Sequence, residues 1–141
     1  MIADKLKQLR SEDRESRIRC AEELGDLLEY GATPASEITA VAAGLIDAIA
    51  SEADSEARES LTNTLAILAS NHIGLKAPWD RLTAVLGSLD TGSLENALCA
   101  LGFSWDRNFE ELLEQYQKHP VESIRDAAAH ALVELRAQGA T

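Results

Sequence analysis

Few residues in this chain combine side-chain types and spacings that support catalysis. The sequence contains three histidines and two cysteines. No HExxH motif, GxSxG motif or glycine-rich phosphate loop occurs. His130 lies four residues from both Asp126 and Glu134, but polar neighbours at this spacing are common on any helix. The sequence therefore predicts no catalytic residue.

The two cysteines do not indicate a metal site or a disulfide framework. Cys20 and Cys99 lie far apart, without CxxC spacing and without a histidine at ligand spacing. We therefore expect no metal, no cofactor and a reducing compartment. The chain starts without an apolar run of signal-peptide length, and its most apolar stretch, residues 38–50, contains Asp47 and is too short to cross a bilayer. These features predict a cytoplasmic protein with no membrane partner.

The chain is strongly acidic. Aspartate and glutamate total 24 residues against 13 lysines and arginines, which gives a formal net charge of -11. Such a charge repels the phosphates of nucleic acids and attracts basic protein surfaces. We therefore expect a basic protein partner and no nucleic acid. The alternative is that the acidity only keeps a small protein in solution.

Four segments of the sequence share the same short pattern. Their reference positions are Arg17, Arg58, Leu94 and Arg125. Seven residues after each stands a leucine, namely Leu24, Leu65, Leu101 and Leu132. Three of the four segments also carry an aspartate four residues before the reference position. The reference positions lie roughly 31 to 41 residues apart, a period typical of paired-helix repeats.

Apolar residues at three- and four-residue steps predict helices along the whole chain and no strands. Thr33-Pro34 is expected to start the third helix, and Gly31 to end the second. The expected helices cover residues 2–10, 14–30, 33–50, 54–71, 80–86, 94–101, 106–116 and 124–135. The predicted fold is an all-α solenoid of four stacked helix pairs in a single domain, with repeats at about 1–31, 32–72, 78–103 and 105–138.

With its segments aligned, the chain resembles the HEAT-like helical repeats over nearly its whole length. In that family an aspartate-containing turn precedes the second helix of each pair, and an arginine stands near the first turn of that helix. The matching residues are Asp13 with Arg17, Asp54 with Arg58, and the segment from Ile124 to Leu132. Leu24-Gly25 and Leu101-Gly102 match the Leu-Gly pair of short bacterial members. Leu94 and Val121 depart from the family pattern.

The second helices of stacked pairs usually line a concave, partner-binding side. Positions one, five and nine after each reference residue should form their outward stripe. The twelve residues are Ile18, Glu59, Glu95, Asp126, Glu22, Asn63, Cys99, His130, Asp26, Ile67, Phe103 and Glu134. Six are acidic and none is lysine or arginine. We predict partner binding by Glu22, Asp26, Glu59, Asn63, Glu95, Asp126, His130 and Glu134.

Three functions are compatible with this pattern. The most concrete is a non-catalytic protein-binding module, such as a small immunity protein that neutralises a basic toxin or nuclease. The resemblance to HEAT-like repeats also implies a bilin-lyase-like enzyme or an enzyme accessory subunit, with Cys99 or His130 as the reactive group. An assembly scaffold is the third. The alternative for the acids of the outward stripe is that they form ordinary solvated helix faces.

Two similar tripeptides, Trp79-Asp80-Arg81 and Trp105-Asp106-Arg107, stand at the starts of consecutive first helices. Each aspartate is expected to cap its helix, and each tryptophan to pack against a neighbouring layer. An exposed tryptophan would instead be a candidate anchor for a partner. The sequence leaves the exposure of Trp79, Trp105 and Phe103 open.

Overall fold

The computed structural model describes residues 2–30 and 33–137, which form eight α-helices and two 3-10 turns without any strand. The prediction of an all-α fold with eight helices is confirmed. Gly31 and the repeat bounds at residues 1, 31, 32 and 138 lie outside the described residues. The α-helices are α1 (Ile2–Gln8), α2 (Arg14–Tyr30), α3 (Ala35–Ser51), α4 (Ser55–Asn71), α5 (Trp79–Thr83), α6 (Thr91–Phe103), α7 (Glu110–Tyr116) and α8 (Glu122–Ala137).

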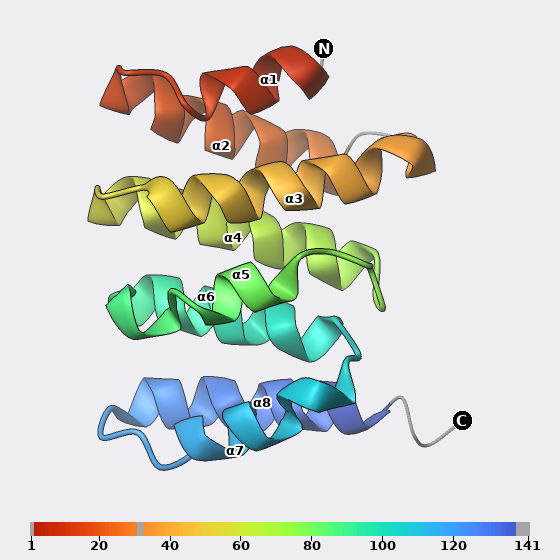
Figure 1. The fold of residues 1–141 in the computed structure, drawn as a ribbon, viewed down its shortest axis with the longest axis vertical. Helices are drawn as coiled ribbons and strands as arrows, with labels where there is room; N and C mark the ends of the chain where they lie inside the picture. The colour runs from red at the N-terminus through yellow and green to blue at the C-terminus, as the bar shows by residue number, and fades with distance from the viewer. Residues whose placement is uncertain (1, 31–32, 138–141) are drawn as a thin grey trace.

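The helices stack in pairs and form two layers (Figure 1). Helices α2, α4, α6 and α8 lie side by side in one layer, and each packs extensively on the next. Helices α1, α3, α5 and α7 cover one side of that layer, with α3 against both α1 and α5 and α7 against α8. The opposite side of the second helices therefore faces outward, and we call it the second-helix face.

The core lies between the two layers. The leucines of the repeated pattern are all buried, at 0% exposure for Leu24, Leu65 and Leu101 and 1% for Leu132. They belong to one continuous apolar cluster that extends from Leu9 to Leu135. Because each helix pair buries its apolar side only against its neighbours, stacking is what stabilises the chain.

Two of the three repeated arginines, Arg17 and Arg125, hold the turn that precedes their own helix. Nη1 of Arg17 donates to the carbonyl oxygens of Ser11 (2.9 Å) and Glu12 (3.2 Å). Nη1 of Arg125 makes the equivalent bonds to the carbonyls five and six residues earlier, at 3.0 and 2.9 Å. Asp13 instead caps α2 by accepting from the amide and hydroxyl groups of Ser16. Arg17 and Arg125 thus satisfy carbonyl groups at the turn, whereas Nε of Arg58 is buried without a hydrogen-bond partner among the described residues.

The glycine of each Leu-Gly pair lies where two second helices are in close contact. A Cβ atom on Gly102 would lie 2.8 Å from both Cα and the carbonyl oxygen of Ala131, in the backbone of α8. A Cβ atom on Gly25 would lie 3.2 Å from Oγ1 of Thr64 in α4. Glycine at this position therefore lets a second helix approach the next one closely, and at Gly102 no larger residue fits without movement.

Several predicted helix bounds differ from the structure: α6 begins at Thr91 and not at residue 94, and α7 begins at Glu110 and not at residue 106. Pro34, not Thr33, precedes α3 as its N-cap residue, and no side chain caps this end. Thr33 stands one position too early, because a residue before proline favours an extended conformation. The helix predicted from Asp80 to Leu86 begins at Trp79, ends at Thr83 and continues only as the 3-10 turn η1 (Leu86–Ser88). Gly87 and Ser88 are poor helix formers, which explains the short α5.

The two tryptophans occupy different environments. Trp79 is 5% exposed, and its indole nitrogen Nε1 donates to the carbonyl oxygen of Leu75 at 3.1 Å. Its predicted packing role is confirmed. Trp105 is half-buried and adopts a left-handed backbone conformation (φ 54°) just after α6. Asp106 caps the 3-10 turn η2 (Arg107–Phe109) by accepting from the amide of Asn108 at 3.0 Å.

Candidate functional site

Most of the predicted outward stripe does reach solvent on the second-helix face. Glu95 and Glu134 are half-buried. The other six predicted partner-binding residues are exposed: Glu22, Asp26, Glu59, Asn63, Asp126 and His130. Ile18 is only 7% exposed, so its placement in the stripe is wrong. An apolar side chain at the start of α2 gains more from burial than from contact with water.

A recess of about 510 Å³ opens between α2 and α4 and reaches α6. We call it the acidic groove. Its lining residues are Glu22, Gly25, Asp26, Glu29, Glu59, Ser60, Asn63, Thr64, Ile67 and Asn96. It brings together four of the eight predicted residues, namely Glu22, Asp26, Glu59 and Asn63. The predicted residues of α6 and α8 lie outside its lining.

The close approach of α2 and α4 forms the floor of the acidic groove. Oγ1 of Thr64 is buried and donates to the carbonyl oxygen of Ala21 at 2.8 Å. Gly25 leaves room for this hydroxyl, and the methyl carbon Cδ1 of Ile67 would lie 3.8 Å from a Cβ atom at the same glycine. The floor is therefore made of a backbone stretch of α2, a satisfied hydroxyl and one apolar side chain.

Four carboxylates line the acidic groove. None of Glu22, Asp26, Glu29 and Glu59 forms an ion pair among residues 2–30 and 33–137. No lysine or arginine lines the groove. Four negative charges around one recess therefore remain without a cation from this chain and create a local negative potential.

Glu59 lines the groove and also lies against the neighbouring helix α6. A Cβ atom on Gly92 would lie 2.6 Å from Oε1 of Glu59, so the carboxylate rests against the first turn of α6. A negative charge near a helix N-terminus is stabilising. Asn96 adds a contact between the same helices, because its Nδ2 donates to Oγ1 of Thr62 at 3.2 Å. Glu59 thus contributes to packing and to the charge of the groove.

Five groove residues lie outside the predicted stripe: Gly25, Glu29, Ser60, Thr64 and Asn96. Glu29 lies three residues after Asp26, and extending the stripe by one helical turn would have included it. Asn96 lies beside the stripe on α6 and enters the groove because α4 and α6 pack closely. No periodicity in the sequence marks Asn96, since its position depends on the distance between two helices.

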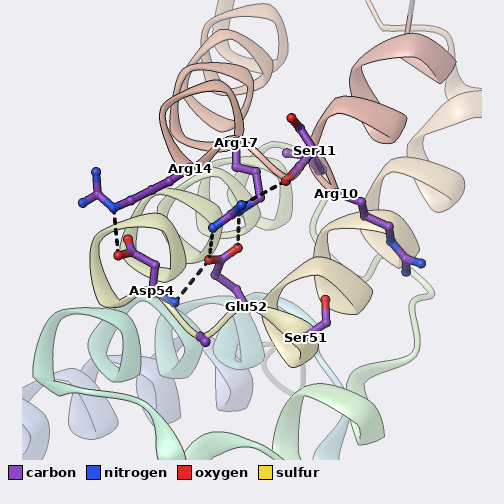
Figure 2. A pocket seen from close by; sticks show the side chains of 9 residues that line it. Arg10, Ser11, Arg14, Arg17, Ser51, Glu52 and Asp54 are labelled. Atoms are coloured by element: carbon purple, nitrogen blue, oxygen red, sulfur yellow. Dashed lines mark hydrogen bonds and ion pairs between the residues drawn. The ribbon is translucent and has the colours of Figure 1, made fainter.

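A second recess, of about 630 Å³, lies at the turns that precede α2 and α4 (Figure 2). Arg17 and Glu52 form a bidentate ion pair there, with Nε to Oε2 at 2.8 Å and Nη2 to Oε1 at 3.0 Å. The Glu52 side chain is 6% exposed, and Oε1 also accepts from the amide of Asp54 at 3.2 Å. Arg14 donates from Nε to Oδ1 of Asp54 at 2.8 Å.

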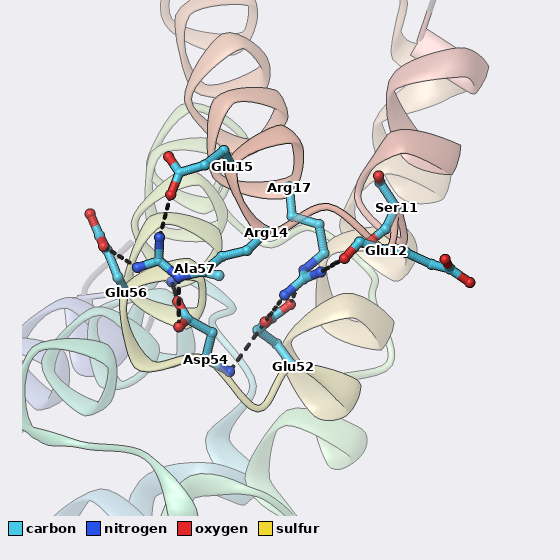
Figure 3. A network of polar contacts seen from close by, with 9 residues as sticks. All are labelled: Ser11, Glu12, Arg14, Glu15, Arg17, Glu52, Asp54, Glu56 and Ala57. Atoms are coloured by element: carbon cyan, nitrogen blue, oxygen red, sulfur yellow. Dashed lines mark hydrogen bonds and ion pairs between the residues drawn. The ribbon is translucent and has the colours of Figure 1, made fainter.

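This network connects the first two repeats (Figure 3). The side-chain hydrogen bond from Arg14 lowers the pKa of Asp54, and the amide of Ala57, which Asp54 caps, lowers it further. Asp54 in turn raises the pKa of the Arg14 guanidinium. The recess is lined by three arginines, Arg10, Arg14 and Arg17, and each has a carboxylate partner, so we interpret this recess as a structural joint.

Cys99 and His130 occupy equivalent positions on the neighbouring helices α6 and α8, and both are exposed. Although the residue reaches solvent, neighbouring atoms partly desolvate its sulfur, and this desolvation raises the pKa of Cys99. The charge of Glu134 raises it further. The thiol is therefore protonated at neutral pH and is not an activated nucleophile. Within the described residues, no group of three or more histidine, cysteine, aspartate or glutamate side chains is arranged to hold a metal ion. Likewise, no helix described here is both long and apolar enough to span a bilayer.

Comparisons with known proteins establish the fold but not a family. No protein-family model and no curated protein matches the chain. Among solved structures, human deoxyhypusine hydroxylase in complex with glycerol is similar, with a TM-score of 0.68 and 19% identity over 99% of this chain. An engineered protein from the Northeast Structural Genomics Consortium is similar with a TM-score of 0.66 and 22% identity over 95% of this chain. The chain spans 45% and 62% of those two structures, respectively.

The similarity to human deoxyhypusine hydroxylase contradicts one prediction. The interpretation of this chain as an immunity protein that inhibits a basic toxin or nuclease is wrong on this finding, because the similar natural protein is an enzyme. At 19% identity the similarity extends to the fold and not to the hydroxylase activity. The chain has a helical repeat fold that it shares with an enzyme.

Proposed function

We propose that this chain acts as an enzyme accessory subunit that holds a basic protein partner on its second-helix face. The acidic groove is the centre of the proposed contact, and Glu95, Asp126, His130 and Glu134 extend it along α6 and α8. The alternative of an assembly scaffold differs only in whether the partner belongs to an enzyme. The similarity of the fold to that of an enzyme favours the accessory subunit.

The observation that supports this proposal is the gathering of four unpaired acids around one recess. Elsewhere, paired and unpaired acids are mixed: Glu52, Asp47 and Glu110 have arginine partners, whereas Asp80 and Glu111 have none among the described residues. In the acidic groove, Glu22, Asp26, Glu29 and Glu59 have none among the described residues. A purely solubilising surface would not require the unpaired acids to surround a recess.

The chemistry of such a contact follows from charge and shape. A lysine or arginine of the partner enters the recess, places its aliphatic stem on the groove floor and its cationic group between the carboxylates. Carboxylates around the rim accelerate association and make it sensitive to salt, whereas a carboxylate that becomes buried in the complex contributes mainly to its lifetime. Nucleic acids are not suitable partners, because their phosphates are repelled by the same charges.

We also infer that the repeats are of the HEAT-like type. Two features of the structure support this inference: Arg17 and Arg125 bond to the carbonyls of the preceding turn, and the Leu-Gly pair allows close packing of the second helices. Both features occur at the positions where the sequence resembles that family.

The proposal can be tested by co-purification from the native source with two charge-reversal variants. The groove variant changes Glu22, Asp26 and Glu59 to lysine. The matched control variant changes Asp4, Asp80 and Glu111 to lysine, three exposed acids of the first-helix layer without ion pairs in the described structure. Both variants have the same net charge.

We expect a stoichiometric basic partner to be retained by the wild-type chain and by the control variant, and lost by the groove variant. The proposed accessory role also predicts that the partner, or a protein bound to it, has an enzymatic activity that changes when this chain is removed. Equal retention by all three forms would refute the acidic groove as the contact.

A further inference from the structure

The acidic groove contains one apolar side chain that the charge of the surface does not explain. Ile67 lines the recess together with Asp26, Glu29 and Asn63, and it is half-buried. Its neighbours in the lining are otherwise polar or glycine. A half-exposed isoleucine in an otherwise polar recess leaves apolar area in contact with water.

The position of Ile67 on α4 corresponds to that of Phe103 on α6. Both stand nine residues after the reference position of their repeat, and α4 and α6 pack side by side (Figure 1). Phe103 is also half-buried, and both side chains pack at the edge of the core. At the corresponding positions of α2 and α8 stand Asp26 and Glu134. In this row across the second-helix face, the two apolar residues of α4 and α6 therefore stand between the acids of α2 and α8.

We propose that Ile67, together with Phe103, is the docking point for an apolar side chain of the basic partner. The proposal rests on the proposed function and specifies the partner further. Its binding segment is amphipathic, with a leucine-like or phenylalanine-like residue flanked by lysines or arginines. The apolar residue covers Ile67, and the flanking cations meet Glu22 and Glu59 towards one end of the groove and Asp26 and Glu29 towards the other.

Two arguments favour such an occupant over a uniformly basic one. First, the unpaired carboxylates are complementary to cations, and they line the same recess as Ile67. Second, an apolar residue in the centre of a contact with charged residues around it is the usual arrangement of a protein interface. A partner that carried only cations would cover Ile67 with the aliphatic stem of a lysine or arginine and not with a fully apolar side chain.

The experiment uses three synthetic helical peptides and the full chain. The first peptide contains lysine and alanine, the second has leucine in place of one central alanine, and the third has glutamate in place of each lysine of the second. Each is titrated into the isotope-labelled protein, and the shifts of backbone amide signals give the binding site and the affinity. We expect the leucine peptide to bind about tenfold more tightly than the alanine peptide. The largest shifts are expected at Ile67 and its neighbours, and none with the glutamate peptide.

A pair of protein variants provides the control. Ile67→Ser removes the proposed docking point, and Ile73→Ser removes an exposed isoleucine outside the groove (45% exposed). The preference for the leucine peptide should disappear in the first variant and persist in the second. The wild-type comparison of the peptides does not depend on either variant, so it decides the question even if Ile67→Ser unfolds the chain.

The outcomes separate this inference from the proposed function. Equal affinity of the leucine and alanine peptides for the groove would overturn the docking point and leave the basic partner in place. Absence of shifts in the groove with either lysine peptide would overturn the proposed function, and the docking point with it. A leucine preference that persists in Ile67→Ser would place the apolar contact elsewhere and refute the inference.

Discussion

Replacement of Gly102 by alanine adds a methyl group at the contact between α6 and α8. The new Cβ atom would lie 2.8 Å from two backbone atoms of Ala131, where ordinary contacts begin at 3.4 Å. Backbone atoms cannot rotate away as the end of a flexible side chain can. The variant therefore forces two extensively packed helices to separate by several tenths of an ångström.

The expected size of the effect combines two opposing terms. Overpacking of a close contact costs about 1–3 kcal/mol. The alanine also favours the helix over glycine by up to about 1 kcal/mol, although Gly102 lies in the last turn of α6, where this gain is smaller. We therefore expect the free energy of unfolding to fall by about 1–2 kcal/mol. Ala131→Gly should not rescue the variant, because Cα and the carbonyl oxygen of residue 131 cause the clash.

Gly87→Ala is the matched control, because a Cβ atom at this exposed position would meet nothing within 4 Å. That variant should be unchanged or more stable by about 0.4–1 kcal/mol, since alanine restricts the unfolded chain. Urea denaturation followed by circular dichroism measures both variants, and an unchanged slope shows that only stability differs. Equal stability of the two variants would refute the close packing of α6 on α8.

Three further variants or reagents test the packing, the turn network and the second-helix face. Leu65→Ala should lower the free energy of unfolding by about 2–5 kcal/mol, and a loss below about 1 kcal/mol would contradict its burial. Asp54→Asn keeps the helix cap but loses the ion pair with Arg14. This ion pair lowers the pKa of Asp54. The stability that the ion pair provides is therefore present at neutral pH and is lost as the pH falls through the lowered pKa. Denaturation midpoints of wild type and Asp54→Asn should therefore differ at pH 7 and converge in acid, and a constant difference would argue against the pair. A maleimide should modify Cys99 in the native protein and Cys20 only after unfolding, as mass spectrometry can show, and early reaction of Cys20 would contradict its burial.

The sequence predicted the fold well where the signal is local. The bounds of α2 and the end of α4 agree with the expectation, because their apolar periodicity is long and clear. The prediction of α5 was too long, because the pattern of Leu82, Val85 and Leu86 outweighed the effect of Gly87. Periodicity shows which residues can face a core, but it does not show whether the backbone completes a second turn.

The candidate site was predicted only in part, for a similar reason. Exposure of the outward stripe follows from helix geometry, and Ile18 was the residue that failed. The gathering of Glu22, Asp26 and Glu59 into one recess depends on the spacing of α2, α4 and α6, which no local pattern contains. The ion pair between Arg17 and Glu52 joins residues far apart in the chain, and it was missed because only the stacked structure brings them together.

The most direct test of the proposed contact is a cross-link of zero length between this chain and its co-purified basic partner. A carbodiimide joins a carboxylate to a lysine amine only when the two groups touch, and mass spectrometry identifies the joined residues. We predict that partner lysines are joined to Glu22, Asp26, Glu29 and Glu59 of the acidic groove. Cross-links confined to the first-helix layer, at Asp4, Asp80 or Glu111, would contradict the proposal that the second-helix face binds the partner.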